Sequence, residues 1–264
     1  MQTALERHLP YFEGILRFEL RPYQKTLLEI KEHMPLVLII DELDGTTNTK
    51  RCLASCLDFA PLATISLALS LSESLEGLVI GAVYALDQRE VFSAIRVEQD
   101  QFLAFHNRCR MLPTEFTHTR GDSQRRIMVI GYSNSHRREK GELEQLLYDA
   151  GFRIYEGCRA SSVDILNMLR NAFDAYVDLR RFWSTKVGGE EKEAMLQVYD
   201  VAGVVPVAEG CGLVVTDAEG RPWKKYSFDE TISLVVARPD IHAKIINIIA
   251  PLVADWQERL TANA

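Results

Sequence analysis

The stretch that decides the fold is IIDELDGTTN, residues 39–48. Its apolar start predicts a buried strand, and Gly45 with the hydroxyls behind it predicts a turn that opens a helix. Asp41 and Asp44 lie where that strand is expected to end, and Mg²⁺ prefers carboxylate oxygens. A helix N-terminus also offers unpaired N–H groups to a phosphate. The alternative interpretation is a plain turn, in which Asp and Gly only form the bend.

A second stretch, residues 198–212, reads VYDVAGVVPVAEGCG and leads into LVVTDAEGRP at residues 213–222. The pattern predicts a helix that opens around Asp200, followed by a strand and a turn. If this helix start lies beside the first turn, Asp200 meets Asp41 and Asp44 from the other half of the chain. Three converging carboxylates indicate a site for a divalent cation.

The composition restricts the class of protein. The chain has 264 residues, of which 47% are hydrophobic and 25% are charged, as is typical of a globular protein. A net charge of −7 argues against a nucleic-acid partner. Five cysteines without a regular framework favour reduced thiols and a cytoplasmic location. The first residues do not resemble a leader, and no apolar run is long enough for a bilayer, so no membrane partner is expected.

Hydrophobic periodicity predicts two halves, residues 1–115 and 116–264, which meet in a polar segment and form one compact unit. The first half is α+β, with helices at 3–18 and 22–35 and strands at 36–40, 61–71, 77–85 and 90–97. Strand 36–40 is continuously apolar, so both of its faces are expected to be covered. The second half is α/β. Its expected strands are 125–131, 152–155, 175–179, 213–216 and 234–237, and its expected helices are 136–150, 162–173, 201–209 (stopped by Gly210) and 239–260.

The two motifs together resemble the inositol monophosphatase-like family of Mg²⁺-dependent, lithium-sensitive phosphatases, to which fructose-1,6-bisphosphatase also belongs. Residues 41–47 are similar to its D-P-[IL]-D-G-T-T motif, and residues 199–203 to its W-D-x-A-A-G helix start. Residues 217–222 match the D-x-x-G-x-P turn that follows. The resemblance covers about residues 36–250. It implies a layered αβαβα sandwich and a homodimer.

The resemblance also implies roles for individual residues. The metal ligands would be Asp41, Asp44, Asp200 and the Leu43 carbonyl, with Mg²⁺ as the ion and Mn²⁺ as an alternative. Asp44 and Thr46 would be the catalytic residues, because the Thr46 hydroxyl orients the attacking water. The phosphate and the rest of the substrate would meet Gly45, Thr46, Ser161, Asp164, Glu193 and Asp200. Two alternatives stay open: Ser161 as a simple helix N-cap, and Glu193 as a solvated charge.

The chain departs from the family pattern upstream of Asp41. A G-E-E segment, whose first Glu binds metal and helps the Thr activate water, is absent, and the upstream T-x-x-D segment is not recognisable. Losing a general-base contribution costs about 10²–10⁴-fold in rate. The glutamates that could replace it are Glu19, Glu29, Glu32 and Glu42. Glu42 adjoins the site, but successive strand residues point to opposite faces.

These observations predict a Mg²⁺-dependent phosphomonoesterase that acts on a small polyol or sugar phosphate. Inositol monophosphate is the first substrate that the resemblance implies, and fructose 1,6-bisphosphate the second. The alternative is a catalytically impaired relative that serves as a metal- or phosphate-binding or regulatory subunit. The missing upstream glutamate is the feature on which this choice depends.

Overall fold

The structure is a computed structural model that describes residues 37–45, 62–98, 101–113, 125–129, 137–158, 160–183, 186–187, 190–191, 195–228 and 230–262. Its first sheet is antiparallel and has six strands that pair in chain order. The strands are β1 (Val37–Asp44), β2 (Thr64–Ser70), β3 (Leu78–Ala85), β4 (Glu90–Glu98), β5 (Gln101–His106) and β6 (Cys109–Arg110). Antiparallel neighbours can be joined by a short connection, as at the expected turn of residues 86–89, whereas residues 45–63 separate β1 from β2.

The second sheet is mixed and has five strands. Their spatial order is β12 (Val214–Thr216), β13 (Leu234–Ala237), β9 (Ala175–Asp178), β7 (Arg126–Val129) and β8 (Arg153–Glu156). Strands β7, β8 and β9 run parallel, whereas β12 and β13 pair antiparallel. A separate short hairpin joins β10 (Lys186–Val187) to β11 (Glu190–Glu191).

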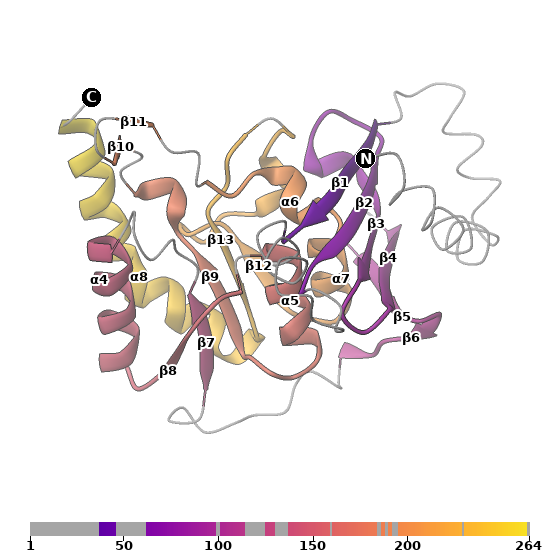
Figure 1. The fold of residues 1–264 in the computed structure, drawn as a ribbon, viewed down its shortest axis with the longest axis horizontal. Coiled ribbons are helices and arrows are strands. Elements are labelled where there is room, and N and C mark those ends of the chain that lie inside the picture. The colour runs from indigo at the N-terminus through magenta and orange to yellow at the C-terminus, as the bar shows by residue number, and fades with distance from the viewer. Residues whose placement is uncertain are drawn as a thin grey trace, which may run out of the picture.

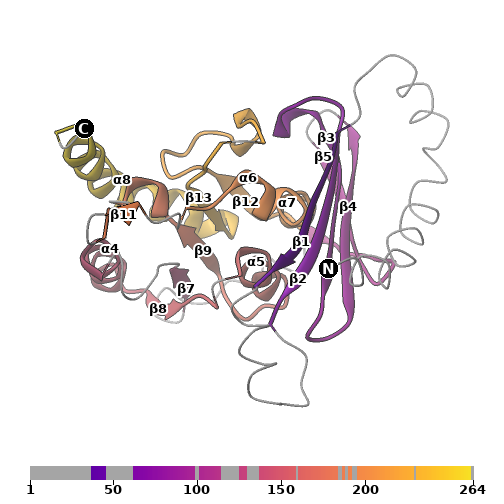
Figure 2. The same cartoon turned by 45° about the horizontal axis from the view of Figure 1, so that its top comes forward.

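Helices and sheets alternate in four layers (Figures 1 and 2). The outer helices α4 (Arg137–Asp149) and α8 (Pro239–Ala262) cover one face of the five-stranded sheet. Between the two sheets lie α5 (Ser161–Leu169), α6 (Val198–Ala202) and α7 (Val205–Gly210). Three short 3-10 turns complete the described elements, η2 (Leu75–Gly77), η5 (Arg180–Phe182) and η6 (Trp223–Lys225). The predicted layered α/β class is confirmed, while the helices expected at 3–18 and 22–35 fall outside the described residues.

The core follows from the two-residue period of the strands. Tyr176 and Val236 face the middle helices, while Val177 and Val235 face α4 and α8. The cluster between the sheets takes buried residues from the first sheet, the second sheet and the middle helices alike. The two halves of the chain therefore share one core, and their division at residues 115 and 116 stays a prediction.

The helix expected at 201–209 is two helices, and the second begins where Pro206 occupies the first turn, a position that does not need a backbone N–H. A Cβ on Gly203 would lie 2.9 Å from the Ala82 carbonyl, and one on Gly81 would lie 2.5 Å from the Gly203 carbonyl. Helix and sheet backbones thus touch where neither residue has a side chain. Gly210 does not stop the second helix but belongs to it, and Gly212, with φ of 82°, takes the left-handed conformation instead.

Strand β1 differs from its expected burial. Ile39 packs against the core between the sheets, but Leu38 and Ile40 on the opposite face are 54% and 38% exposed. The expectation that both faces are covered is therefore wrong at these two positions. The continuous apolar run gave no signal of this, since strand residues alternate between faces that the sequence does not distinguish.

Candidate metal and phosphate site

A bulge brings the two motif aspartates to the same face of β1. Asp41 pairs with Ser66 and Asp44 pairs with Thr64, so three steps on β1 match two steps on β2. Ser66 and Thr64 lie two residues apart and hence on one face, which requires one extra residue in β1 between the aspartates. In a regular strand, residues three apart would point to opposite faces. The D-x-x-D spacing therefore works as a pair only because the strand is irregular here.

Gly45 ends β1 in a conformation that other residues rarely adopt. Its φ is 92°, and a Cβ would lie 2.7 Å from the Leu62 carbonyl oxygen. Both the positive φ and the close approach require glycine. The turn that is expected to present the N–H groups of Gly45 and Thr46 therefore requires glycine at position 45. Thr46 itself lies outside the described residues.

The N-terminus of α5 binds the side chain of Asp44, which belongs to the six-stranded sheet. The backbone N–H of Ser162 donates to Asp44 Oδ2 over 2.7 Å. A carboxylate at this end of a helix is stabilised by the unpaired N–H groups and the helix dipole. The N-cap position belongs to Ala160, and no side chain caps the helix. Ser161 is therefore the first helical residue, and the alternative that made it the N-cap is wrong.

Asp200 reaches the same region from α6. It occupies the third position of that helix, where its Oδ2 accepts the Gln197 N–H over 2.9 Å in a capping box. The Ser162 hydroxyl donates to the Asp200 carbonyl over 2.8 Å, so the first turns of α5 and α6 are joined directly. The predicted meeting of the two motifs occurs, and Ser162 is the residue that links them.

Asp164 belongs to the same acidic group. It is buried in the first turn of α5, and its two oxygens accept the Cys158 N–H over 3.0 and 3.1 Å. Asp41 accepts the Leu43 N–H over 3.3 Å. Each of the four aspartates is therefore held by a backbone N–H, which orients the carboxylate and leaves it lone pairs for further ligands.

The electrostatic environment of these carboxylates is unfavourable to their charge. Burial raises the pKa of Asp44 well above its ordinary value despite the Ser162 N–H, and repulsion from Asp41, Asp200 and Asp164 raises it further. Burial, followed by smaller charge effects, raises the pKa of Asp164 and of Asp200 to about 6 each. Such mutual repulsion is what a bound cation relieves.

The donor set fits a hard divalent cation. Carboxylates from two strand positions and two helix starts lie near enough to repel one another, three of them partly buried and Asp164 fully buried, and Mg²⁺ takes such oxygens. Within the described ranges, no three His, Cys, Asp or Glu side chains are yet gathered closely enough to complete a metal shell. One backbone N–H group holds each carboxylate, and the remaining lone pairs are available to a cation.

The remaining predicted residues are placed as follows. The Leu43 carbonyl lies within β1, and Gly45 is buried at its end. Glu193 falls outside the described residues, as do the upstream glutamates Glu19, Glu29 and Glu32, and of Glu42 the structure describes the backbone alone. The sequence interpretation missed the ion pair between Asp178, the last residue of β9, and Arg180, which shifts the pKa of Asp164 and of Asp200. Its signal was two charged residues at the end of a strand that is otherwise apolar.

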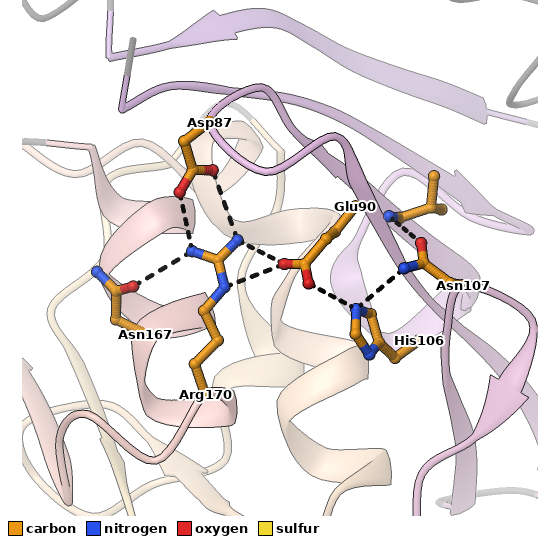
Figure 3. A network of polar contacts seen from close by, with 7 residues as sticks. Asp87, Glu90, His106, Asn107, Asn167 and Arg170 are labelled. Atoms are coloured by element: carbon orange, nitrogen blue, oxygen red, sulfur yellow. Dashed lines mark hydrogen bonds and ion pairs between the residues drawn. The ribbon is translucent and has the colours of Figure 1, made fainter. Parts of the chain in front are cut away.

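The opposite end of α5 carries a second polar cluster, which we call the Arg170 network (Figure 3). Arg170 caps α5 and binds Glu90 over 2.8 Å and Asp87 over 3.2 Å, both on the six-stranded sheet or its turn. Glu90 also meets His106 over 3.1 Å, and the His106 ring stacks on Phe92. The network is Asp87, Glu90, His106, Asn107, Asn167 and Arg170. Helix α5 is thus tied to the first sheet at both ends.

The fold and the site together define a layered α/β protein with an acidic centre between its two sheets. The model of the inositol monophosphatase family matches residues 23–254, and the chain belongs to this family. The fructose-1,6-bisphosphatase/inositol-1-monophosphatase of Archaeoglobus fulgidus is 24% identical over 221 residues, which cover 80% of this chain and 68% of that protein. Membership supports phosphatase activity of this superfamily.

Solved structures share the fold. An inositol monophosphatase described as SaIMPase-II with bound inositol monophosphate aligns with a TM-score of 0.61 at 16% identity, covering 88% of this chain and 77% of the other. An IMPase/NADP phosphatase complexed with Mg²⁺ and phosphate aligns with a TM-score of 0.56 at 18% identity, covering 83% and 68%. The family thus includes a magnesium-bound member. In the described part of our chain, no helix is both long and apolar enough to cross a membrane.

Proposed function

We propose that this chain is a Mg²⁺-dependent phosphomonoesterase for a small polyol or sugar phosphate. The observation that carries the proposal is the bond from the α5 N-terminus to Asp44, on the face that Asp44 shares with Asp41 and near Asp200. The family supplies the reaction class. The relatives that bind inositol monophosphate, or are named for fructose 1,6-bisphosphate, supply the substrate candidates in that order.

In this proposal each residue has a defined task. Asp41, Asp44 and Asp200 would hold the cation with the Leu43 carbonyl, and the turn of Gly45 and Thr46 would bind the phosphate. A bound divalent cation polarises the phosphate and lowers the pKa of a coordinated water. Asp44 would also be a catalytic residue, with the Thr46 hydroxyl orienting the water. The polyol hydroxyls would meet Ser161, Asp164, Glu193 and Asp200.

The test is phosphate release from a panel of phosphate monoesters by the purified chain. We expect Mg²⁺-dependent release from at least one of inositol monophosphate, fructose 1,6-bisphosphate and related sugar phosphates. Asp44→Asn should reduce that rate by at least about 10³-fold, since it removes a buried charged ligand. Asp87→Asn, at the opposite end of α5, is the matched control and should keep most of the activity. Equal rates for wild type and Asp44→Asn on every substrate would reject the proposal.

A second candidate is a metal- or phosphate-binding or regulatory subunit without catalysis. The observation in its favour is the missing G-E-E segment, whose glutamate would have served both a metal and Thr46. Calorimetric titration with Mg²⁺ or Mn²⁺ separates the two candidates. Two or more metal sites support the enzyme, whereas one weak site or none supports the binding protein. The homodimer, the absence of nucleic-acid and membrane partners, and the cytoplasmic location remain predictions.

A further inference from the structure

The hydroxyl of Thr64 lies buried beside the acidic site without a hydrogen-bond partner. Thr64 opens β2 and is completely buried. Among the residues that the structure describes, it is the only one whose buried hydroxyl makes no hydrogen bond. A hydroxyl can donate one hydrogen bond and accept two, and leaving it unsatisfied inside a protein costs free energy. Such a group in a native fold requires an explanation, and a bound ion or water is a common one.

The strand register places Thr64 directly beside Asp44. The two residues are partners in the antiparallel ladder of β1 and β2. Directly opposite side chains lie on the same face of a sheet, with their Cβ atoms about 4.5–5.5 Å apart. The Thr64 hydroxyl is attached to its Cβ, so an ion or small molecule bound to the Asp44 carboxylate would come within its reach.

The face of β2 that carries Thr64 is the one that meets the middle helices. Ser66, two residues further along, lies against α6, since a Cβ on Gly203 would be 2.8 Å from the Ser66 Cβ. Residues two apart share a face, so Thr64 also lies toward α5 and α6, which pack against β1 and β2 (Figure 2). Asp44 meets the same layer, because the Ser162 N–H binds its Oδ2 over 2.7 Å.

The other neighbours of Thr64 in the sheet offer its hydroxyl nothing. Its partner on β3 is Ala85, which has no polar side chain and belongs to the apolar core between the sheets. The residue before it, Ala63, adjoins the expected phosphate turn, since a Cβ on Gly45 would lie 3.1 Å from the Ala63 Cα. The hydroxyl therefore stands between the apolar core on one side and the Asp44 carboxylate on the other.

We infer that the Thr64 hydroxyl binds a water molecule of the divalent cation that Asp44 holds. Mg²⁺ usually keeps several of its waters in a protein site, and the cation makes these waters strong hydrogen-bond donors. A hydroxyl oxygen has the lone pairs to accept such a bond. Thr64 is then a positioning residue that contacts the cation only through water. The inference rests on the proposed function in one respect, namely that Asp44 holds a divalent cation.

This role has different consequences for the metal-free and the metal-bound protein. Without the cation the hydroxyl is unsatisfied, so replacing it by a methyl group of the same shape removes a cost and should not lower stability. With the cation, the replacement removes a hydrogen bond that supports a metal ligand, and such a loss typically weakens metal binding by about 10–100-fold. A hydroxyl with a purely structural role would show the reverse, namely lower stability without metal and an unchanged affinity.

The experiment measures Mg²⁺ affinity and metal-free stability of Thr64→Val. Calorimetric titration of the metal-free full chain with Mg²⁺ alone should show binding at least about tenfold weaker than in wild type. Urea denaturation in chelator should give a midpoint equal to or higher than that of wild type. Thr64→Ser keeps a hydroxyl with the same lone pairs, so its Mg²⁺ affinity should stay within about threefold of wild type.

The matched control is Ser70→Ala, at the other end of β2. Ser70 is also completely buried, but its hydroxyl has protein partners, donating to the Ser74 carbonyl over 3.0 Å and accepting the Ser72 N–H over 3.2 Å. This variant should lower the urea midpoint in chelator and leave the Mg²⁺ affinity unchanged. The two variants together separate a hydroxyl that serves the fold from one that serves the cation.

Several results would overturn the inference. An unchanged Mg²⁺ affinity in Thr64→Val would mean that the hydroxyl binds an ordinary buried water only, and equally weak binding in Thr64→Ser would mean that the hydroxyl is not the group that matters. A lower urea midpoint of Thr64→Val in chelator, or its failure to fold, would show that the hydroxyl has a partner without the cation. A wild type that binds no Mg²⁺ overturns this inference and the proposed function together. A wild type that binds Mg²⁺ without releasing phosphate overturns only the proposed function.

Discussion

The two ends of α5 both gather carboxylates, but a guanidinium contacts those at the C-terminal end, whereas those at the N-terminal end repel one another. At the C-terminal end, two carboxylates, Asp87 and Glu90, share the Arg170 guanidinium, and Glu90 has His106 as a further partner. At the N-terminal end, Asp44 shares its surroundings with three other aspartates, and burial first and repulsion second raise its pKa. A cluster whose carboxylates contact a guanidinium, which we call balanced, stabilises the fold by itself. An unbalanced one costs stability until a cation arrives, which is the expected signature of a binding site.

The largest effect should come from breaking the balanced end. Arg170→Met leaves Asp87 and Glu90 facing each other without the guanidinium, so we expect a loss of about 2–4 kcal/mol in the free energy of unfolding. Urea denaturation measures this loss. Arg138→Met removes an exposed pair with Glu142 and should cost less than about 1 kcal/mol. Mg²⁺ affinity should stay within about twofold of wild type; a large fall would show that the two ends are not independent.

Removing charge at the unbalanced end should have the opposite sign. Asp44→Asn relieves buried repulsion, so the metal-free protein should gain about 1–2 kcal/mol in the free energy of unfolding. Thermal and urea denaturation in a chelator test this gain. With excess Mg²⁺, wild type should become more stable than Asp44→Asn, because only wild type gains the full free energy of metal binding. If Asp44→Asn is less stable than wild type in chelator, the proposed difference between the two ends of α5 is wrong. The control is Asp87→Asn at the balanced end, which should be less stable than wild type.

The pH dependence of stability is a further test of the repulsion among the aspartates at the N-terminal end of α5. The folded pKa of Asp200 and of Asp164 is about 6, above the ordinary value, so the folded state binds more protons than the unfolded state between about pH 4 and 6. The metal-free protein should therefore lose stability as the pH rises through this window. The penalty, on the order of 3 kcal/mol at Asp200, should be complete near pH 7.

Denaturation of wild type and Asp200→Asn in chelator, at a series of pH values, isolates this contribution. The variant should be the more stable of the two at pH 7.5, and its advantage should vanish near pH 4 as the wild-type carboxyl becomes protonated. A constant difference across the series would mean that Asp200 does not titrate in this range.

The smallest effect should come from the hydroxyl that joins the two helix starts. Ser162→Ala removes the 2.8 Å bond to the Asp200 carbonyl but keeps the backbone N–H that holds Asp44. We expect a loss of about 1 kcal/mol in the free energy of unfolding and a fall of less than about threefold in Mg²⁺ affinity. Thr261→Ala, which removes an exposed hydroxyl bond in the last turn of α8, should change neither quantity measurably.

Local patterns predicted the second half of the fold well. Strand β13 occupies the residues expected for it, 234–237, and β9 and α8 begin at the expected residues. Asp precedes and ends β9, and Pro follows β13 and opens α8, which makes these limits visible in the sequence. The break between α6 and α7 was missed although the sequence signals it, because Pro206 stands in the first turn of α7 and proline suits a helix start but not a helix interior.

The candidate site could be predicted in part. The aspartates Asp41, Asp44 and Asp200 followed from two motifs and their order, but the bulge that aligns the first two depends on pairing with a strand that begins twenty residues later. The role of Ser162 depends on the packing of α5 against α6, which no local pattern shows. The Arg170 network joins segments up to 83 residues apart. In the sequence, its charged residues cannot be distinguished from those of an ordinary surface ion pair.

The bond from Ser162 to Asp44 spans 118 residues of sequence, whereas the six-stranded sheet is built from consecutive hairpins. Hairpins close short loops and form early, while contacts between distant segments must await the ordering of the chain between them. The acidic site should thus be among the last parts of the molecule to assemble during refolding. Time-resolved Mg²⁺ binding would then report the completion of the native state, after the circular dichroism signal of the sheet has already appeared.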